Sequence, residues 1–166
     1  LEKNCKDLNK IFFINQKKSR PYIILKVAQS LDGKIALSNG LSSWISNSDS
    51  RKDTHLMRAE MKGILVGKNT AITDNPSLTV RLSQKELGLT KSMPIPQPTK
   101  IILGELTQIT DAKKVFAKRA KVIVGSKKSG FAKKNVEYLQ YKNKNFLNAF
   151  MGDLLKRNIT SVLVEG

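Results

Sequence analysis

The chain alternates between short apolar runs and longer mixed segments, and this alternation predicts an α/β fold. The runs are rich in valine, isoleucine and leucine, which is typical of strands buried on both faces of a parallel sheet. Segments of helical length separate several of these runs, so we expect a mostly parallel central sheet flanked by helices. The predicted strands are residues 22–28, 63–67, 100–104, 121–125, 136–141 and 161–164.

The polar segments between the runs carry signals for helices, turns and loops. Residues 47–50 read Asn-Ser-Asp-Ser, a helix N-cap cluster, and predict a helix over 49–60. Residues 146–157 have apolar side chains at helical spacing and predict an amphipathic helix. The turn pairs Asp32-Gly33 and Asn39-Gly40 enclose 34–37, which we interpret as a short strand in a small hairpin. Three prolines mark 83–99 as an irregular loop.

The stretch from Gly67 to Arg81 attracts the most interest. It follows the apolar run 63–67 and presents Asn69, Thr70, Asp74 and Asn75. Open α/β sheets hold their ligands at the carboxyl ends of their strands, so these small polar groups are candidates for a binding site. The alternative interpretation is a capped helical turn that a proline-containing loop follows, with no ligand at all.

Size and composition indicate one globular domain and exclude several classes of protein. The chain has 166 residues, 40% of them apolar, which is enough to bury a core without disulfides or metals. No apolar run is long enough to cross a bilayer, so no membrane partner is expected. Cys5 is the single cysteine and His55 the single histidine, so no metal site is expected. A reducing, cytoplasmic location is the default.

The strong positive charge leaves two classes of function open. A net charge of +17 suits nucleic acids, anionic membranes or phosphorylated small molecules. The lysines are scattered over many predicted elements, and aromatic residues make up only 6% of the chain. A surface for single-stranded nucleic acid would interleave the two. We therefore favour a generally lysine-rich surface, with a basic nucleic-acid-binding module as the alternative.

The two ends of the chain suggest a particular domain organisation. Residues 1–19 have one apolar cluster and then become basic, so we expect a linker or the tail of a preceding domain. Pro21 permits an extended segment to begin there, and residues 20–166 form the second unit. The last predicted strand leads directly into Glu165-Gly166, without a helix to cover it. We expect this unit to be incomplete at its C-terminus.

Short motif-like runs occur at 20–22 with 25–28, 30–36, 40 with 42–45, 56–59, 64–67 with Thr70, 74–81 and 164–166. Together they resemble the reductase domain of the bifunctional riboflavin-biosynthesis deaminase/reductases, the RibD family. The runs occur in the family's order and at its spacings, densely over 20–81 and thinly beyond. The resemblance implies a dihydrofolate-reductase-like fold and NADPH-dependent reduction of 5-amino-6-(5-phosphoribosylamino)uracil, in which the ribosyl group becomes a ribityl chain. The cofactor would carry that chemistry, and the protein would bind, orient and balance charge.

Carried over by motif, the resemblance assigns roles to individual residues. Lys26 would be a proton donor or electrostatic partner, and Glu165 would approach the base or ribose of the substrate; these two are the catalytic candidates. The arginines among the substrate residues suit a phosphate, which a guanidinium binds in bidentate fashion. The substrate residues implied are Ser42, Arg58, Leu78, Arg81 and Glu165, and the NADPH residues are Ala28, Trp44, Thr70, Asp74 and Gly166.

Some features depart from the family or remain open. Relatives often carry Asp and a small residue after the apolar residues 100–103, where this chain has Gly104-Glu105. Residues 126–128, Ser-Lys-Lys, would either meet the 2′-phosphate of NADPH or form an exposed basic loop. The deaminase metal signature is absent, so deamination would belong to a covalently linked preceding domain. The resemblance also implies a homodimer. Another dihydrofolate-reductase-like enzyme, acting on a pterin or a different pyrimidine, remains the alternative.

Overall fold

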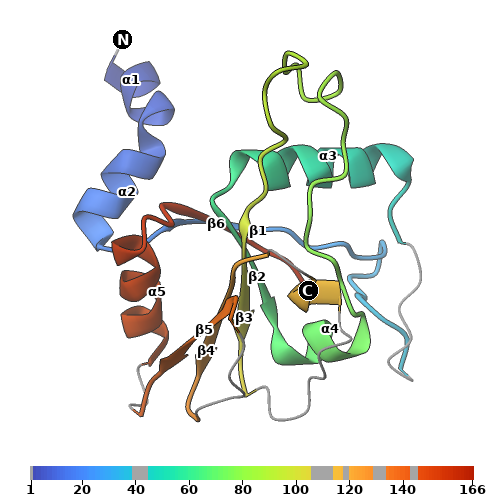
Figure 1. Ribbon diagram of the computed structural model, residues 1–166. Helices are drawn as coiled ribbons and strands as arrows, with labels where there is room; N and C mark the ends of the chain where they lie inside the picture. The colour runs from blue at the N-terminus through green and yellow to red at the C-terminus, as the bar shows by residue number, and fades with distance from the viewer. Residues whose placement is uncertain (1, 39–44, 106–113, 118–119, 129–133, 143–145) are drawn as a thin grey trace.

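The described part of the chain folds around one parallel sheet. The computed structural model describes residues 2–38, 45–105, 114–117, 120–128, 134–142 and 146–166. Within these ranges six strands form a single sheet in the order β1-β6-β2-β3-β4-β5, and every pairing is parallel (Figure 1). The prediction of an α/β fold with a mostly parallel sheet is confirmed. The strands are β1 Tyr22–Leu25, β2 Gly63–Gly67, β3 Thr99–Leu103, β4 Val122–Ser126, β5 Val136–Gln140 and β6 Ser161–Val164.

The apolar runs form strands because side chains on both faces of the sheet are buried. Successive residues of a strand point to opposite faces. Ile64 and Val66 of β2 pack into one core cluster, and Leu65 packs into the other. The first cluster includes Ala71 of helix α4, and the second includes Phe150 of helix α5. The two faces of the sheet therefore have separate cores under different helices.

The helices form where the sequence has caps or amphipathic spacing. Helix α3 begins after Asn47, whose side-chain oxygen accepts a hydrogen bond from the Ser50 N–H at 2.9 Å. The helices predicted at 49–60 and 146–157 are confirmed as α3 and α5. The loop predicted at 83–99 is irregular up to β3. The helices are α1 Glu2–Leu8, α2 Lys10–Lys18, α3 Ser48–Glu60, α4 Lys68–Thr73, α5 Phe146–Lys156 and the 3₁₀ helix η1 Lys114–Phe116. None of the described helices combines the length and apolarity needed to cross a membrane.

Two predictions near the N-terminal strand are wrong in detail. β1 ends at Leu25 instead of residue 28 because its partner β6 ends at Val164, and the last backbone bond runs from the Lys26 N–H to the Val164 carbonyl. Residues 34–37 form no strand. The turn at Gly33 does form, with φ of +78°, but it closes on itself through hydrogen bonds between Ser30 and Lys34. The second predicted turn, at 39–40, lies outside the described residues.

The segment before β1 is helical and its second half is attached to the sheet. Helices α1 and α2 occupy the region expected to be a linker or the tail of a preceding domain (Figure 1). The side-chain amide of Asn15 in α2 donates to the carbonyls of Arg20 and Thr160, both at 3.0 Å. Thr160 lies just before β6. Helix α2 thus ties the entry of β1 to the entry of β6.

Candidate functional site

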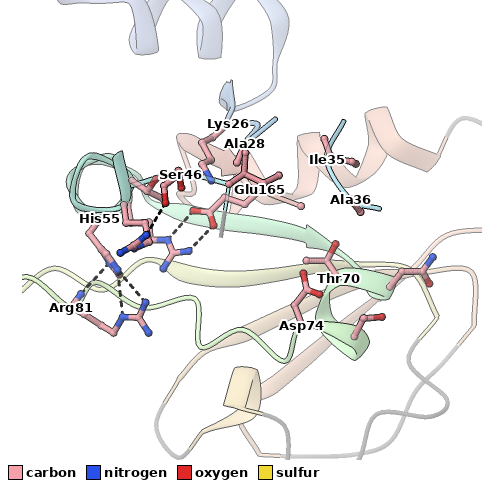
Figure 2. Close-up of a pocket in the computed structure, with 17 residues that line it drawn as sticks. Lys26, Ala28, Ile35, Ala36, Ser46, His55, Thr70, Asp74, Arg81 and Glu165 are labelled. Carbon is pink, nitrogen blue, oxygen red and sulfur yellow. Dashed lines mark hydrogen bonds and ion pairs between the residues drawn. The ribbon is translucent and has the colours of Figure 1, made fainter. Parts of the chain in front are cut away.

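A cavity of about 690 Å³ opens at the carboxyl edge of the sheet. Parallel strands bring the segments that follow them to the same edge, so residues distant in sequence meet there. Lys26 follows β1, Glu165 follows β6, and Thr70 lies in α4 directly after β2. Helix α3 forms one wall (Figure 2). The lining residues are Lys26, Ala28, Ile35, Ala36, Ile45, Ser46, Arg51, Thr54, His55, Arg58, Asn69, Thr70, Thr73, Asp74, Arg81, Glu165 and Gly166.

Most of the site residues implied by the sequence resemblance line this cavity. They come from α3, α4, the loop after α4 and the segments that follow β1 and β6: Lys26, Ala28, Arg58, Thr70, Asp74, Arg81, Glu165 and Gly166. Leu78 does not. Its side chain is only 2% exposed and packs with Ile64 and Val66 in the core, because its backbone turns at φ of +49°. Ser42 and Trp44 lie outside the described residues.

Arg58 and Glu165 form a bidentate ion pair inside the cavity. Arg58 Nε donates to Glu165 Oε1 at 2.8 Å, and Nη2 donates to Oε2 at 2.6 Å (Figure 2). The two side chains are 13% and 11% exposed. Nη1 of Arg58 donates to the Thr79 carbonyl at 3.1 Å, and the Glu165 backbone N–H donates to the Leu65 carbonyl. The guanidinium of Arg58 is therefore fixed in position and already has a counter-charge.

His55 contacts Arg81 at two points. The Arg81 backbone N–H lies 3.3 Å from His55 Nδ1, and the Nε and Nη2 atoms of Arg81 lie 3.4 Å and 3.3 Å from His55 Nε2. A neutral imidazole has one accepting nitrogen, so each tautomer accepts one of these bonds. Burial, followed by the nearby guanidinium groups of Arg58 and Arg81, lowers the pKa of His55 below its ordinary value.

The cavity has an excess of basic groups. Arg51, Arg58, Arg81 and Lys26 line it against two carboxylates, and one of those carboxylates is paired with Arg58. Arg51 Nη1 donates to the Ser46 carbonyl at 2.7 Å, which attaches α3 to the segment that enters it. Such a balance favours an anionic ligand. No cluster of three or more potential metal ligands occurs among the residues that the structure describes.

The other side of the cavity is built from small polar groups of α4 and from Gly166. A Cβ atom on Gly166 would lie 3.4 Å from Thr70 Oγ1, so the backbone approaches α4 closely there. Asn75, a further candidate from the sequence, turns away. Its side-chain oxygen accepts a hydrogen bond from the Lys114 N–H at 2.8 Å, and it does not line the cavity.

The basic segment after β4 lies apart from this cavity. Ser126 is the buried last residue of β4, and its Oγ accepts a hydrogen bond from the Lys128 N–H at 3.2 Å. The Lys128 ammonium pairs with Glu105, which follows β3, at 3.4 Å. Glu105 therefore has a counter-charge of its own at the carboxyl edge of β3 and β4.

Sequence reasoning missed the full contribution of helix α3. It took Arg58 from the resemblance, but it considered His55 only as a metal ligand and gave it no place in the site. Arg51, His55 and Arg58 are spaced i, i+4 and i+7, which places them on one face of a helix. That spacing was visible in the sequence. It carried no indication that this face would look across at Glu165, which comes 107 residues after Arg58.

Comparisons with known proteins agree on one group of relatives. The model of the family described as "RibD C-terminal domain" matches residues 21–166. The riboflavin biosynthesis protein RibD of Aquifex aeolicus is 39% identical over 171 residues, which cover 99% of this chain and 45% of that protein. RibD of Haemophilus influenzae is 32% identical over 172 residues, covering 99% and 46%. The chain spans about half the length of these curated relatives.

Solved structures show the same likeness. A diaminohydroxyphosphoribosylaminopyrimidine deaminase/5-amino-6-(5-phosphoribosylamino)uracil reductase from Thermotoga maritima matches with a TM-score of 0.82 and 34% identity, over 99% of this chain and 44% of that one. The riboflavin biosynthesis reductase Rib7 of Saccharomyces cerevisiae matches with a TM-score of 0.66 and 25% identity, over 96% and 72%. The fold is therefore similar to that of these reductases, as the sequence resemblance implied.

Proposed function

The chain belongs to the RibD C-terminal domain family, and from this premise we propose that it reduces 5-amino-6-(5-phosphoribosylamino)uracil with NADPH. The observation that supports the proposal most is the convergence at one basic cavity. Residues that the family resemblance assigns to substrate and cofactor come together there from separate segments of the chain. A different pterin or pyrimidine substrate is the competing proposal within the same fold.

The substrate half of the cavity is proposed around Arg81. Glu165 already occupies two donor atoms of Arg58, so Arg58 has few N–H groups left for a phosphate. Arg81 is more exposed and suits the phosphate of the substrate through its guanidinium fork. Glu165, held by Arg58, would face the base or ribose. Leu78 would contribute only through its backbone, because its side chain lies in the core.

The cofactor half is proposed along α4 and the end of β6. The residues that line this part of the cavity are Thr70, Asp74, Ala28 and Gly166. They suit NADPH because Gly166 has no side chain where the backbone comes close to Thr70. When bound, NADPH would supply the hydride for the reduction. Lys26 is half-buried and lines the same cavity, so its ammonium is the proposed proton donor or electrostatic partner.

The wider setting of the domain is also part of the proposal. A cytoplasmic homodimer with a deaminase domain linked before helix α1 would agree with the Thermotoga maritima protein, which is named as both deaminase and reductase. Residues 1–19 would then be the connection between the two domains, and residues 20–166 would belong to the reductase unit.

Thermal unfolding with and without NADPH tests the proposal. A ligand that binds only the folded protein stabilises it by about 2.7 kcal/mol at 100 times its Kd, so saturating NADPH should raise the Tm. A short DNA oligonucleotide is the matched control. It should raise the Tm only at low salt if the charge of the chain acts non-specifically, since such binding weakens steeply with salt. A Tm that NADPH leaves unmoved, together with salt-sensitive stabilisation by DNA, would contradict the reductase proposal.

A further inference from the structure

His55 lines the cavity, but the proposed function gives it no task. We propose that His55 is a positioning residue: its neutral imidazole accepts a hydrogen bond from Arg81 and holds that guanidinium ready for the anionic group of the substrate. This inference rests on the proposed function, because the anion in question is the phosphate of the proposed substrate.

The first support is the difference in rigidity between the two residues. His55 lies on α3, a 13-residue helix, and is half-buried. Arg81 is exposed and lies in a loop without regular structure. A long exposed side chain loses much rotamer freedom when it is fixed, so it needs a partner to keep one orientation. His55 contacts both the backbone and the guanidinium of Arg81 and supplies that partner.

The second support is the set of charges that face the imidazole. Arg58 lies one turn further along the same helix, Arg81 comes from the loop, and Glu165 comes from the end of β6. The guanidinium groups of Arg58 and Arg81 act against a proton on His55, while the Glu165 carboxylate, which is paired with Arg58, acts for it. A neutral ring keeps an accepting nitrogen, and arginine can only donate. A hydrogen bond with the Thr79 backbone and the charge of Glu165 raise the pKa of His55, but burial and the two guanidinium groups outweigh them.

The third support is what protonation would do. An imidazolium has two donors and no acceptor, so it would lose the bond from Arg81 and repel its guanidinium. The orientation of Arg81 should therefore depend on the charge of His55. Substrate affinity should fall as the pH drops through the range in which His55 takes up a proton.

Nuclear magnetic resonance tests the contact without any turnover. His55 is the only histidine of the chain, so one imidazole signal reports its pKa directly. We expect Arg81→Ala to raise the pKa of His55, because the substitution removes a nearby positive charge and also part of the side chain that buries the imidazole. Lys121→Ala is the matched control: it removes one exposed positive charge before β4, at the opposite edge of the sheet, and should leave the signal unchanged. An unchanged pKa in Arg81→Ala would overturn the inference.

Kinetics test the positioning role. We expect His55→Ala to raise the KM for the phosphorylated substrate about tenfold, with NADPH affinity kept, as for a lost bond to a charged group. His55→Gln supplies an uncharged acceptor and should restore the KM within about twofold. Glutamine does not titrate, so His55→Gln should also lack the part of the affinity loss at low pH that is due to His55. The titration of the substrate phosphate affects both proteins equally, so the difference between their pH profiles reports His55 alone.

The two variants combined with Arg81→Ala complete the test. If His55 acts through Arg81, then His55→Ala should have no further effect on KM in an Arg81→Ala background. An effect that persists there, or that His55→Gln fails to rescue, would overturn the inference and indicate a structural role. If the protein reduces the substrate but the His55 pKa does not change in Arg81→Ala, the inference is overturned and the proposed function stands. If the His55 pKa rises in Arg81→Ala but the protein does not reduce the substrate, the proposed function is contradicted. The role of His55 in substrate binding is then contradicted with it.

Discussion

At the scale of single residues, the bidentate ion pair between Arg58 and Glu165 joins helix α3 to the end of strand β6. Both side chains are nearly buried, so removing one partner leaves a charge that water cannot solvate well. The same pair determines which arginine is available to a ligand. A residue that sequence comparison assigns to substrate binding can thus have its charge balanced within the protein before any substrate arrives.

This pair gives a prediction about stability. We expect Glu165→Gln to lower the free energy of unfolding by about 2–3 kcal/mol, because Arg58 loses its counter-charge in a poorly solvated position. Urea denaturation measures it. The matched control is Glu137→Gln, which breaks the more exposed pair with Arg157 and should cost less than about 1 kcal/mol. Equal losses in both variants would show that burial does not set the strength of the Arg58 pair.

A second prediction at this scale concerns Arg81. We expect Arg81→Ala to weaken binding of the phosphoribosyl substrate at least about tenfold, since a bidentate contact to phosphate is lost, while NADPH affinity stays nearly the same. Calorimetric titration of each ligand measures both. Lys85→Ala, which removes an exposed charge from the same loop, should change neither. Equal weakening of both ligands by Arg81→Ala would contradict the assignment of Arg81 to the substrate.

The lowered pKa of His55 gives a third prediction, on pH. The unfolded chain has the ordinary pKa of about 6.5, so below that pH it binds more protons than the folded protein does. Stability should therefore fall as the pH drops below about 6.5 and level off once the folded protein also takes up the proton. Denaturation curves at several pH values for the natural chain and for His55→Gln measure the difference. An identical pH dependence in the variant would show that His55 does not contribute to it.

Most of the secondary structure could be predicted because strands that are buried on both faces of the sheet occur as continuous apolar runs in the sequence. β2 and β6 begin and end at the predicted residues, and both are continuous apolar runs. The errors fall where pairing decides the outcome. Residues 26–28 continue the pattern of β1, but β6 offers them no further partner. Residues 34–37 have strand-like composition and end up in a turn, because no neighbouring strand lies along them.

At the scale of elements, the fit between α5 and the sheet gives a fourth prediction. A Cβ atom on Gly125 of β4 would lie 2.7 Å from the Phe150 ring of α5, so Gly125→Ala should cost about 1–3 kcal/mol of stability through overpacking. Gly67, at the end of β2, has no atom within 4 Å of its added Cβ and is the matched control. Thermal unfolding compares the two. A destabilised Gly67→Ala and a stable Gly125→Ala would contradict the packing described here.

At the scale of the whole molecule, the parallel sheet explains why the position of the candidate site could be predicted from the sequence, whereas the contacts among its residues could not. The strand pattern alone indicated a candidate binding site at the carboxyl edge, after 63–67, and a cavity opens at that edge. The resemblance added residues from other segments. It could not show that Arg58 would pair with Glu165 or that Leu78 would point into the core, since both depend on how distant segments pack in three dimensions. His55 was missed for the same reason.

The order of the strands also bears on how the protein is made. β6 is the last strand of the described chain, yet it sits between β1 and β2. β1 therefore has no strand partner, and β2 has only β3, until residues 161–164 have been synthesised. Until then, the edges of β1 and β2 that β6 will cover remain open to wrong partners, the hazard of sheets built from distant pairings. The four-residue strand β6 then joins β1 to the other described strands in one late step.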